Sequence, residues 1–315
     1  MTHTYTYMVF IMWSIEELVH RAQDTVRDFH KLQTLINDTK YELEFEFNIR
    51  SKRYVVKERT SIPMVFFGDI HGDINTLVEL MIKLNAVEYL NSNSMKMVFL
   101  GDYIDRGPQQ LLTLTFLSIL KCEWRENILL LRGNHEPVKG LEPYPHDFPY
   151  ELVERFGSDG GRELYYSFLE MFEAMPLLLY IPDRILAFHG GPPLSRAERY
   201  TDPDTILNVG NKEDFEDVLW SDPTEDIEGV SYNVYRGAGK LWGWRISERI
   251  VEKLDIKVMI RGHEPCNGFK INHRGMVVTL FSMKGYYGNE SAAALRIPYD
   301  DNSWLSNIAS YILLL

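Results

Sequence analysis

Several short polar motifs in the sequence carry side chains of the types that bind metal ions and hold phosphate. The candidate metal ligands among them are Asp69, His71, Asp102, Asn134, His189 and His263. Carboxylates, amide oxygens and imidazoles from separate loops form binuclear sites, in which one carboxylate bridges the two ions. We expect the first three residues to bind one ion and the last three to bind the other. Asp102 would belong to both sets and bridge the ions.

Such a site could hydrolyse a phosphate ester. Two ions ~3.5–4 Å apart lower the pKa of a trapped water toward ~7, and the resulting metal-bridging hydroxide could attack phosphorus in line. His135 is placed to protonate the leaving oxygen, with Asp105 orienting its ring, so these two are the expected catalytic residues. Arg106 and Arg236 are candidates for fork-like contacts to the phosphate, which Asn134 would also face.

The elements that position the first motifs alternate between strand and helix. Apolar runs at 64–67, 97–100 and 128–131 each end in a polar cluster, and helical patterns follow over 77–84 and 111–120. This order predicts a parallel βαβ core with the polar clusters at the carboxyl ends of the strands. Open α/β sheets bind their ligands at that edge.

The second half of the chain supplies the remaining strands. Two apolar runs, at 184–188 and 257–260, end at His189 and just before His263. Three further runs, at 269–271, 276–281 and 292–297, have the pattern of antiparallel strands that would form a second sheet packed on the first. The expected fold class is therefore α/β, a sandwich of two mixed sheets flanked by helices, with the active site at the strand carboxyl ends.

The N-terminal region is expected to form a helix and a strand. Ser14 and Glu17 have the spacing of a capping box at the start of a helix that continues to Phe29. Apolar residues then alternate with polar ones from Tyr41 to Ile49, which predicts a half-buried strand. Residues 1–50 would be an appendage packed on a catalytic domain formed by residues 51–315.

Composition excludes several classes of protein. The net charge of −12 argues against a nucleic-acid binder, and two cysteines imply no disulfide framework and a reducing cytoplasm. No apolar run approaches the ~18 residues of a membrane span. The run at 8–13 is interpreted as a leader or an edge strand, the run at 312–315 as a docked tail, and the acidic run at 213–217 as a solvated face.

The motifs at 68–72, 101–107, 131–136 and 189–191 resemble those of the phosphoprotein phosphatases, within the calcineurin-like metallophosphoesterase superfamily. The resemblance extends from about Met64 to Ile297. It implies a metallophosphoesterase-type sandwich, serine/threonine phosphatase activity on phosphorylated proteins, and Tyr286 lining the active-site cleft. It also implies two divalent ions, with manganese expected first and iron or zinc as alternatives.

Two segments depart from the family pattern. The late loop at 281–288 places Tyr287 where eukaryotic members typically have a cysteine, which puts sensitivity to the family's natural toxins in doubt. The segment at 235–239 matches the family only in part, so the role of Arg236 is less firmly based. In the motif at 261–265 and in the absence of obvious regulatory tails, the sequence is more similar to compact archaeal or bacterial members of the family.

Alternative functions stay open. A small-molecule phosphoesterase, such as a dinucleoside polyphosphate hydrolase, would use the same catalytic residues. An inactive scaffold would lack ligands, and none is missing; a nuclease is disfavoured by the acidic charge. Arg132 could orient its own loop or touch substrate, and 220–223 resembles a family segment near the cleft. His146 and His273 lie in no motif and are interpreted as solvent or loop histidines, and Cys266 as a packing residue.

Overall fold

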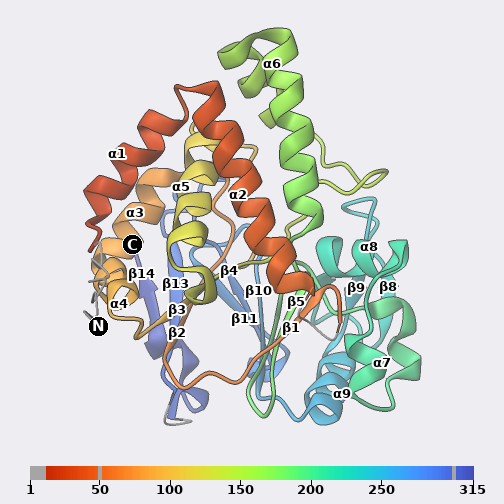
Figure 1. The fold of residues 1–315 in the computed structure, drawn as a ribbon. Coiled ribbons are helices and arrows are strands. Elements are labelled where there is room, and N and C mark those ends of the chain that lie inside the picture. Colours follow the sequence, from red (N-terminus) through yellow and green to blue (C-terminus); the bar gives the residue numbers. More distant parts are fainter. Residues whose placement is uncertain (1–11, 49–51, 300–302) are drawn as a thin grey trace, which may run out of the picture.

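Two β-sheets packed face to face form the centre of the molecule, with helices on both outer faces (Figure 1). The computed structural model describes residues 12–48, 52–299 and 303–315. The five-stranded sheet has the order β14-β13-β2-β3-β4. Its strands are β2 (Met64–Phe67), β3 (Lys96–Phe99), β4 (Ile128–Leu130), β13 (Ala293–Ile297) and β14 (Ile312–Leu314). Strands β2, β3 and β4 are parallel, as the βαβ pattern predicted.

The six-stranded sheet has the order β1-β5-β6-β10-β12-β11. Its strands are β1 (Val55–Lys57), β5 (Leu178–Ile181), β6 (Ile185–Phe188), β10 (Val258–Arg261), β11 (Phe269–Asn272) and β12 (Val277–Leu280). A small third sheet, in the order β7-β9-β8, contains β7 (Asp222–Pro223), β8 (Val230–Tyr232) and β9 (Lys240–Trp242).

Helices cover the outer faces of both large sheets. Those on the five-stranded sheet are α1 (Ile15–Thr25), α2 (Phe29–Asn48), α3 (Ile74–Lys83), α4 (Ala86–Asn91), α5 (Gln110–Glu123) and α6 (Phe148–Glu173). Those on the six-stranded sheet are α7 (Pro203–Leu207), α8 (Lys212–Trp220) and α9 (Trp244–Leu254). The 3₁₀ segments are η1 (Arg125–Asn127), η2 (Leu194–Arg199), η3 (His273–Gly275), η4 (Ser303–Leu305) and η5 (Ile308–Tyr311).

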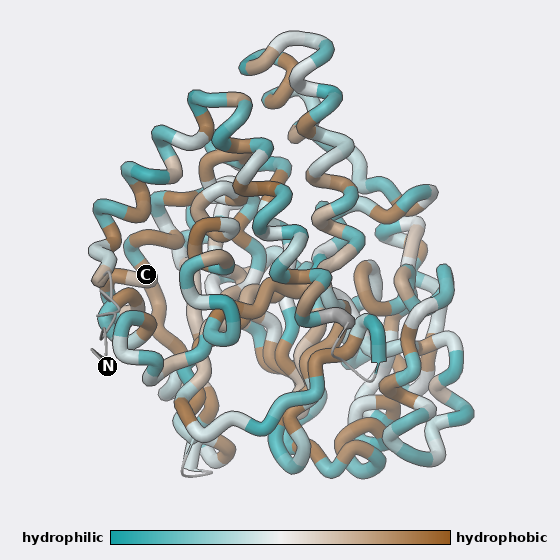
Figure 2. Tube along the Cα trace, viewed as in Figure 1, coloured by the Kyte–Doolittle hydropathy of each residue, from teal (hydrophilic) through white to brown (hydrophobic). Residues whose placement is uncertain are grey.

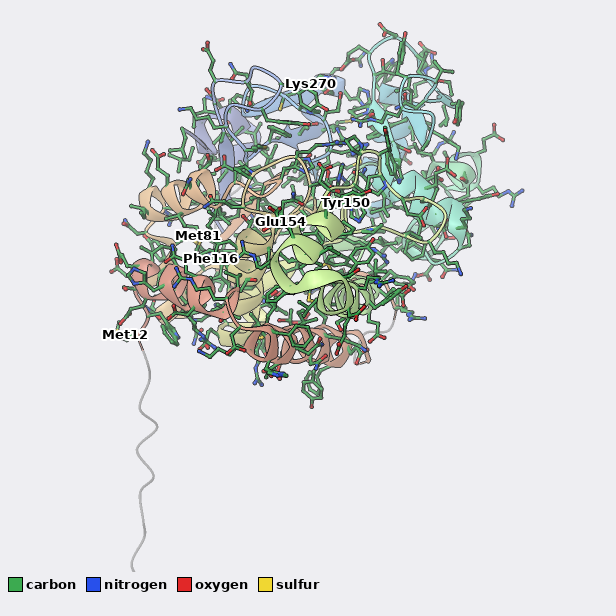
Figure 3. All side chains as sticks on the ribbon, turned by 90° about the horizontal axis from the view of Figure 1, so that it is seen from above. Met12, Met81, Phe116, Tyr150, Glu154 and Lys270 are labelled. Atoms are coloured by element: carbon green, nitrogen blue, oxygen red, sulfur yellow. The ribbon has the colours of Figure 1, made fainter. Side chains whose placement is uncertain are left out.

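The core between the sheets is apolar on both sides. Phe66 and Leu295 from one sheet meet Leu179 and Ile260 from the other, and all four are fully buried. Because both faces of the central strands are covered, strands such as β2 and β6 are hydrophobic throughout and do not alternate, and Figure 2 shows much of the centre in brown. In the helical layer, Met81 of α3 and Phe116 of α5 belong to a separate buried cluster; both are labelled in Figure 3.

The predicted sandwich of two mixed sheets flanked by helices is confirmed, but the late strands are distributed differently than expected. Strands β11 and β12 join β10 in the six-stranded sheet, whereas β13 pairs antiparallel with β2 in the five-stranded sheet. The late strands therefore do not form a second sheet of their own. Each sheet therefore combines early and late segments of the chain. Strand β13 pairs with β2 in one sheet, and β12 pairs with β10 in the other.

The capping box at Ser14 is confirmed. Its hydroxyl accepts the Glu17 N–H at 3.2 Å, and the Glu17 carboxylate accepts the Ser14 N–H at 2.8 Å. The helix ends at Thr25, and a second helix begins at Phe29. The predicted leader or edge strand at 8–13 lies largely outside the described residues.

The predicted strand from Tyr41 to Ile49 is wrong, because helix α2 continues through this segment to Asn48. Its polar residues do not alternate into solvent as a strand would place them. Glu42 pairs with Arg125, and Glu46 pairs with Lys121, so both carboxylates face the end of α5. Residue 49 lies outside the described residues.

Both ends of the described chain pack on the centre. Helices α1 and α2 share a buried cluster with α5 and α6, and the boundary at residue 50 stays a prediction. The docked tail is confirmed, since β14 pairs with β13. Among the helices that the structure describes, none has the length and apolar character needed to cross a membrane.

Candidate metal centre

The expected metal ligands converge at the carboxyl ends of strands from both sheets. Asp69 follows β2, Asp102 follows β3, and His263 follows β10. Backbone hydrogen bonds join these loops: the His263 N–H donates to Oδ1 of Asp69 at 2.7 Å, and the His135 N–H donates to Oδ1 of Asp102 at 2.9 Å. The two sheets therefore meet at a single polar cluster.

The backbone of this cluster adopts the left-handed region at several non-glycine residues. They are His71 (φ 45°), Asp102 (φ 58°), Asp105 (φ 62°), Arg106 (φ 71°) and His263 (φ 73°). Such conformations cost on the order of 1–3 kcal/mol each and occur preferentially at functional sites, where the surrounding structure enforces them. Their concentration here indicates that side-chain placement, and not local stability, determines this backbone.

In the neutral ring of His189, the nitrogen that faces the other acceptors carries no hydrogen. Its Nδ1 donates to the Leu100 carbonyl at 2.9 Å, because a carbonyl only accepts, so Nε2 of the neutral ring presents a lone pair. That Nε2 lies 2.9 Å from Oδ1 of Asn134 and 3.3 Å from Oδ1 of Asp102. A cation bound by these atoms would remove the repulsion between them, so the atoms are suitable metal ligands.

His71 shows the same arrangement, whereas His263 faces the cluster through its other nitrogen: its Nδ1 lies 3.0 Å from Oδ1 of Asn134. Nδ1 of His71 is held by the Ile104 carbonyl at 2.9 Å, and its Nε2 lies 3.5 Å from Oδ2 of Asp102 and 3.9 Å from Oδ2 of Asp69. Nε2 of His263 is buried and has no hydrogen-bond partner among the described residues. Backbone carbonyls that fix the tautomer of an imidazole are typical of metal-binding histidines.

Asp102 belongs to two overlapping groups of potential ligands. One contains His71, Asp102 and His135, and the other contains Asp102, His189 and His263; within each, the ligand atoms lie no more than 4.8 Å apart. The shared carboxylate agrees with the predicted bridging position. The donor set of carboxylates and imidazoles fits divalent ions of the first transition row.

The ionisation of these groups also suits metal binding, which requires neutral imidazoles. Burial lowers the pKa of His71 to about 4, and burial together with the charge of Arg236 lowers the pKa of His263 well below its usual value. Burial and the neighbouring Asp102 carboxylate raise the pKa of Asp69 to about 7. An ion beside Asp69 would offset this effect by stabilising its charged form.

The expected acid–base pair is in contact. Nδ1 of His135 lies 2.6 Å from Oδ2 of Asp105, and Oδ1 of Asp105 accepts the N–H groups of Asp147 and Phe148 at the start of α6. Burial alone would lower the pKa of His135, but the carboxylates of Asp102 and Asp105 outweigh it and raise that pKa. The two carboxylates therefore favour the protonated form of His135, the form that a proton donor requires.

The expected phosphate-binding residues lie around the cluster. Arg106 donates to the Tyr144 carbonyl at 3.3 Å and is only partly buried. Arg236 pairs with Asp222 and donates to the His263 carbonyl at 3.1 Å. The Tyr286 ring lies 6.1 Å from the ring of His71, centroid to centroid. The segment at 220–223 also lies beside the cluster, with the Trp220 ring 6.0 Å from that of His263.

The structure favours one of the two roles considered for Arg132 and changes the interpretation of two histidines. Arg132 is buried and donates to the carbonyls of Glu136 and Pro137, so it orients its own loop. His146 lies in a loop, one of the two alternatives expected, but it is not exposed to solvent because it bonds to Asp105 at 2.7 Å. His273 lies in η3 and is fully buried against Ser247, so neither alternative describes it.

The acidic run at 213–217 is not a solvated face. Asp214 and Asp217 are buried, because they pair with Arg196 and Lys240 respectively. Cys266 is only partly buried.

Two buried charges that organise the site had no role assigned from the sequence. The Glu136 carboxylate accepts the N–H groups of Asp102, Tyr103 and Gly133 at 2.8, 2.8 and 2.9 Å, so it ties two ligand loops together. Arg261 is fully buried and bonds to Asp222 at 2.9 Å. Glu136 lies in the motif at 131–136 and Arg261 in the motif at 261–265. This position within a motif was the signal in the sequence that could have assigned them a role.

The fold and the cluster together define a metal-binding hydrolase of the two-sheet α/β class. Residues 62–267 match the model of the calcineurin-like phosphoesterases, and the chain belongs to that family. The family implies divalent metal ions at this site.

Individual proteins are similar to this chain in sequence or in fold. The chain is 32% identical over 246 residues to the serine/threonine-protein phosphatase BSL2 of Arabidopsis thaliana, a match of 73% of this chain and 23% of that protein. The chain thus spans about a quarter of the length of this curated relative.

Two solved structures are similar in fold. A protein serine/threonine phosphatase from Saccharomyces cerevisiae, with similarity to human phosphatase PP5, aligns with a TM-score of 0.71 at 18% identity, over 91% of this chain and 89% of that one. A cold-active protein-tyrosine phosphatase of a psychrophilic Shewanella species aligns with a TM-score of 0.51 at 17% identity, over 78% and 77%.

Proposed function

We propose that this protein hydrolyses phosphoserine and phosphothreonine monoesters in other proteins, using two divalent ions, with manganese as the first to test. The observation that carries the proposal is that one carboxylate links the ligand cluster to the acid–base pair: Oδ1 of Asp102 accepts the backbone N–H of His135 at 2.9 Å. The name of the Arabidopsis relative, a serine/threonine-protein phosphatase, supports the substrate class.

The proposed ligand set is that expected from the motifs. It consists of Asp69, His71, Asp102, Asn134, His189 and His263. Divalent ions bound by these residues would lower the pKa of a water molecule and neutralise the phosphate charge. Arg236 would present its guanidinium to the phosphoryl oxygens, since Asp222 fixes its orientation. Arg106 and Tyr286 would also line the phosphate-binding site.

His135 would act on the leaving group. As the ester P–O bond breaks, its electron pair passes to the serine or threonine oxygen, which is strongly basic and takes a proton. Because Asp105 holds Nδ1 of His135 at 2.6 Å, Nε2 is the nitrogen left to donate that proton. Asp105 keeps its negative charge and stabilises the imidazolium before the transfer.

One assay distinguishes this function from hydrolysis of small molecules. Phosphate release is measured from a phosphoserine peptide and from a dinucleoside polyphosphate, each with manganese and after chelation. We expect release from the peptide with manganese and its loss after chelation. Cleavage of the dinucleotide with an inert peptide would contradict the proposal in favour of a dinucleoside polyphosphate hydrolase.

A further inference from the structure

Asp105 has a second imidazole partner besides His135. Nδ1 of His146 lies 2.7 Å from Oδ2 of Asp105, the same oxygen that His135 contacts at 2.6 Å. Nε2 of His146 in turn lies 2.8 Å from the hydroxyl of Tyr165. Asp105 is fully buried and the His146 side chain is 13% exposed, so water competes little for these bonds.

The direction of each hydrogen bond follows from the acceptor at its centre. A carboxylate only accepts, so both imidazoles present an N–H at Nδ1 to Asp105. In the neutral ring of His146, Nε2 then accepts the hydroxyl hydrogen of Tyr165. With the two backbone N–H groups on Oδ1, Asp105 has four donors and no free rotation about its last bond.

The shape of helix α6 makes this contact available. Gly157 has φ 74° and ψ 173°, so the helical path breaks there, and α6 continues as a second arm (Figure 1). The arms approach closely, since a Cβ on Gly161 would meet backbone atoms of Val153 at 2.6 Å. Tyr165 on the second arm can therefore reach His146, which lies just before the first arm.

We propose that His146, held by Tyr165, is a positioning residue for the acid His135. Two imidazoles on one oxygen hold Asp105 in the rotamer that directs the His135 ring toward the leaving group. Without His146, Oδ2 of Asp105 would keep His135 as its single donor, so the carboxylate could rotate about its last bond and the His135 ring would lose its fixed direction. This inference rests on the proposed function, because it concerns the acid of that reaction.

The effect should depend on how much the leaving group needs a proton. A serine alkoxide needs protonation as it departs, whereas the nitrophenolate of p-nitrophenyl phosphate is stable without it. A positioning role for the acid therefore affects the phosphoserine peptide more than the aryl ester. General disturbance of the site would slow both substrates alike.

The test uses four variants of the manganese-loaded protein. His146→Ala removes the contact, and His146→Asn replaces Nδ1–H with an amide N–H of similar reach. Tyr165→Phe removes the hydroxyl that holds His146. Tyr166→Phe is the matched control, since Tyr166 is the neighbouring residue and 64% exposed.

We expect His146→Ala to lower kcat on the phosphoserine peptide by about 10- to 100-fold, as loss of an orienting partner does at metal sites. The KM, the metal content and the rate on p-nitrophenyl phosphate should change far less. His146→Asn should recover most of the loss, Tyr165→Phe should lose less than His146→Ala, and Tyr166→Phe should match the wild type. Equal losses on both substrates, or no recovery in His146→Asn, would overturn the inference.

A second measurement does not depend on turnover. This measurement is an NMR spectrum of zinc-loaded protein with ¹⁵N-labelled histidine. Imidazole protons in short hydrogen bonds to a carboxylate resonate far downfield. We expect one such resonance from His135 and one from His146. His146→Asn should remove one resonance and His146→Ala should also shift that of His135. An unchanged His135 resonance in His146→Ala refutes positioning, whatever the substrate. An inactive wild type with a shifted resonance would refute the proposed function alone.

Discussion

Nε2 of His189 faces Oδ1 of Asp102 across 3.3 Å, while Nδ1 of the same ring is occupied by the Leu100 carbonyl. Two acceptor atoms are thus held together in a site where both residues are almost fully buried. Without a cation, the Asp102 carboxylate favours a proton on this ring, because it raises the pKa of His189 despite the opposing effect of burial. If a cation is bound here, the neutral ring and the carboxylate would both be available as its ligands.

The first prediction concerns metal content. Asp102→Asn should reduce bound manganese from two ions per chain to one or none, since the proposed bridging charge is lost. An ion at about 100 times its dissociation constant stabilises the folded state by about 2.7 kcal/mol per site, so chelation should lower the thermal midpoint of the wild type but hardly that of the variant. Elemental analysis and thermal unfolding measure both. Asp159→Asn is the control, since that side chain is fully exposed. Two ions retained in Asp102→Asn would rule out bridging.

The second prediction separates acid catalysis from metal binding at His135. His135→Ala should lower kcat on a phosphoserine peptide by about 10²–10⁴-fold while both ions stay bound. Steady-state kinetics and elemental analysis on one preparation give the answer. The exposed His30, changed to Ala, serves as the control. Loss of an ion from His135→Ala would show instead that His135 is a ligand, as its position beside His71 and Asp102 permits.

The third prediction concerns Asp222, whose carboxylate pairs with both Arg236 and Arg261. Arg236→Ala should lower kcat/KM with little change in stability, because Arg236 lies at the edge of the site. Asp222→Ala should destabilise the protein by about 3–5 kcal/mol, since it leaves the fully buried Arg261 without its Asp222 partner. Urea unfolding compared with kinetics distinguishes the two. A stable Asp222→Ala variant would mean that Glu264 alone neutralises Arg261.

The sequence predicted the parts of the site that are encoded locally. Each proposed ligand follows an apolar run, so strand ends and their order could be assigned without knowledge of the sheets. The residues without an assigned role act through contacts distant in the sequence. His146 lies 41 positions from Asp105, and Arg261 lies 39 positions from Asp222, and neither has a local pattern that names its partner.

The strand predicted in the N-terminal region was wrong for a related reason. Between Tyr41 and Ile49, glutamates alternate with apolar residues, which has the period of a half-buried strand. In the structure, Glu42 pairs with Arg125 and Glu46 pairs with Lys121, near the end of α5 and more than 70 positions away. Tertiary ion pairs therefore produced an alternation that imitates a strand.

The last prediction tests this helix directly. In a strand, Tyr41, Leu43 and Phe45 would share one face and have similar burial. In α2, Leu43 is fully buried, whereas Tyr41 is 64% and Phe45 is 55% exposed. Leu43→Ala should therefore cost about 2–5 kcal/mol of unfolding free energy. Tyr41→Ala should change it by no more than about 0.5 kcal/mol, as surface substitutions usually do. Urea unfolding of both variants measures the difference, and similar costs at the two positions would contradict the helix.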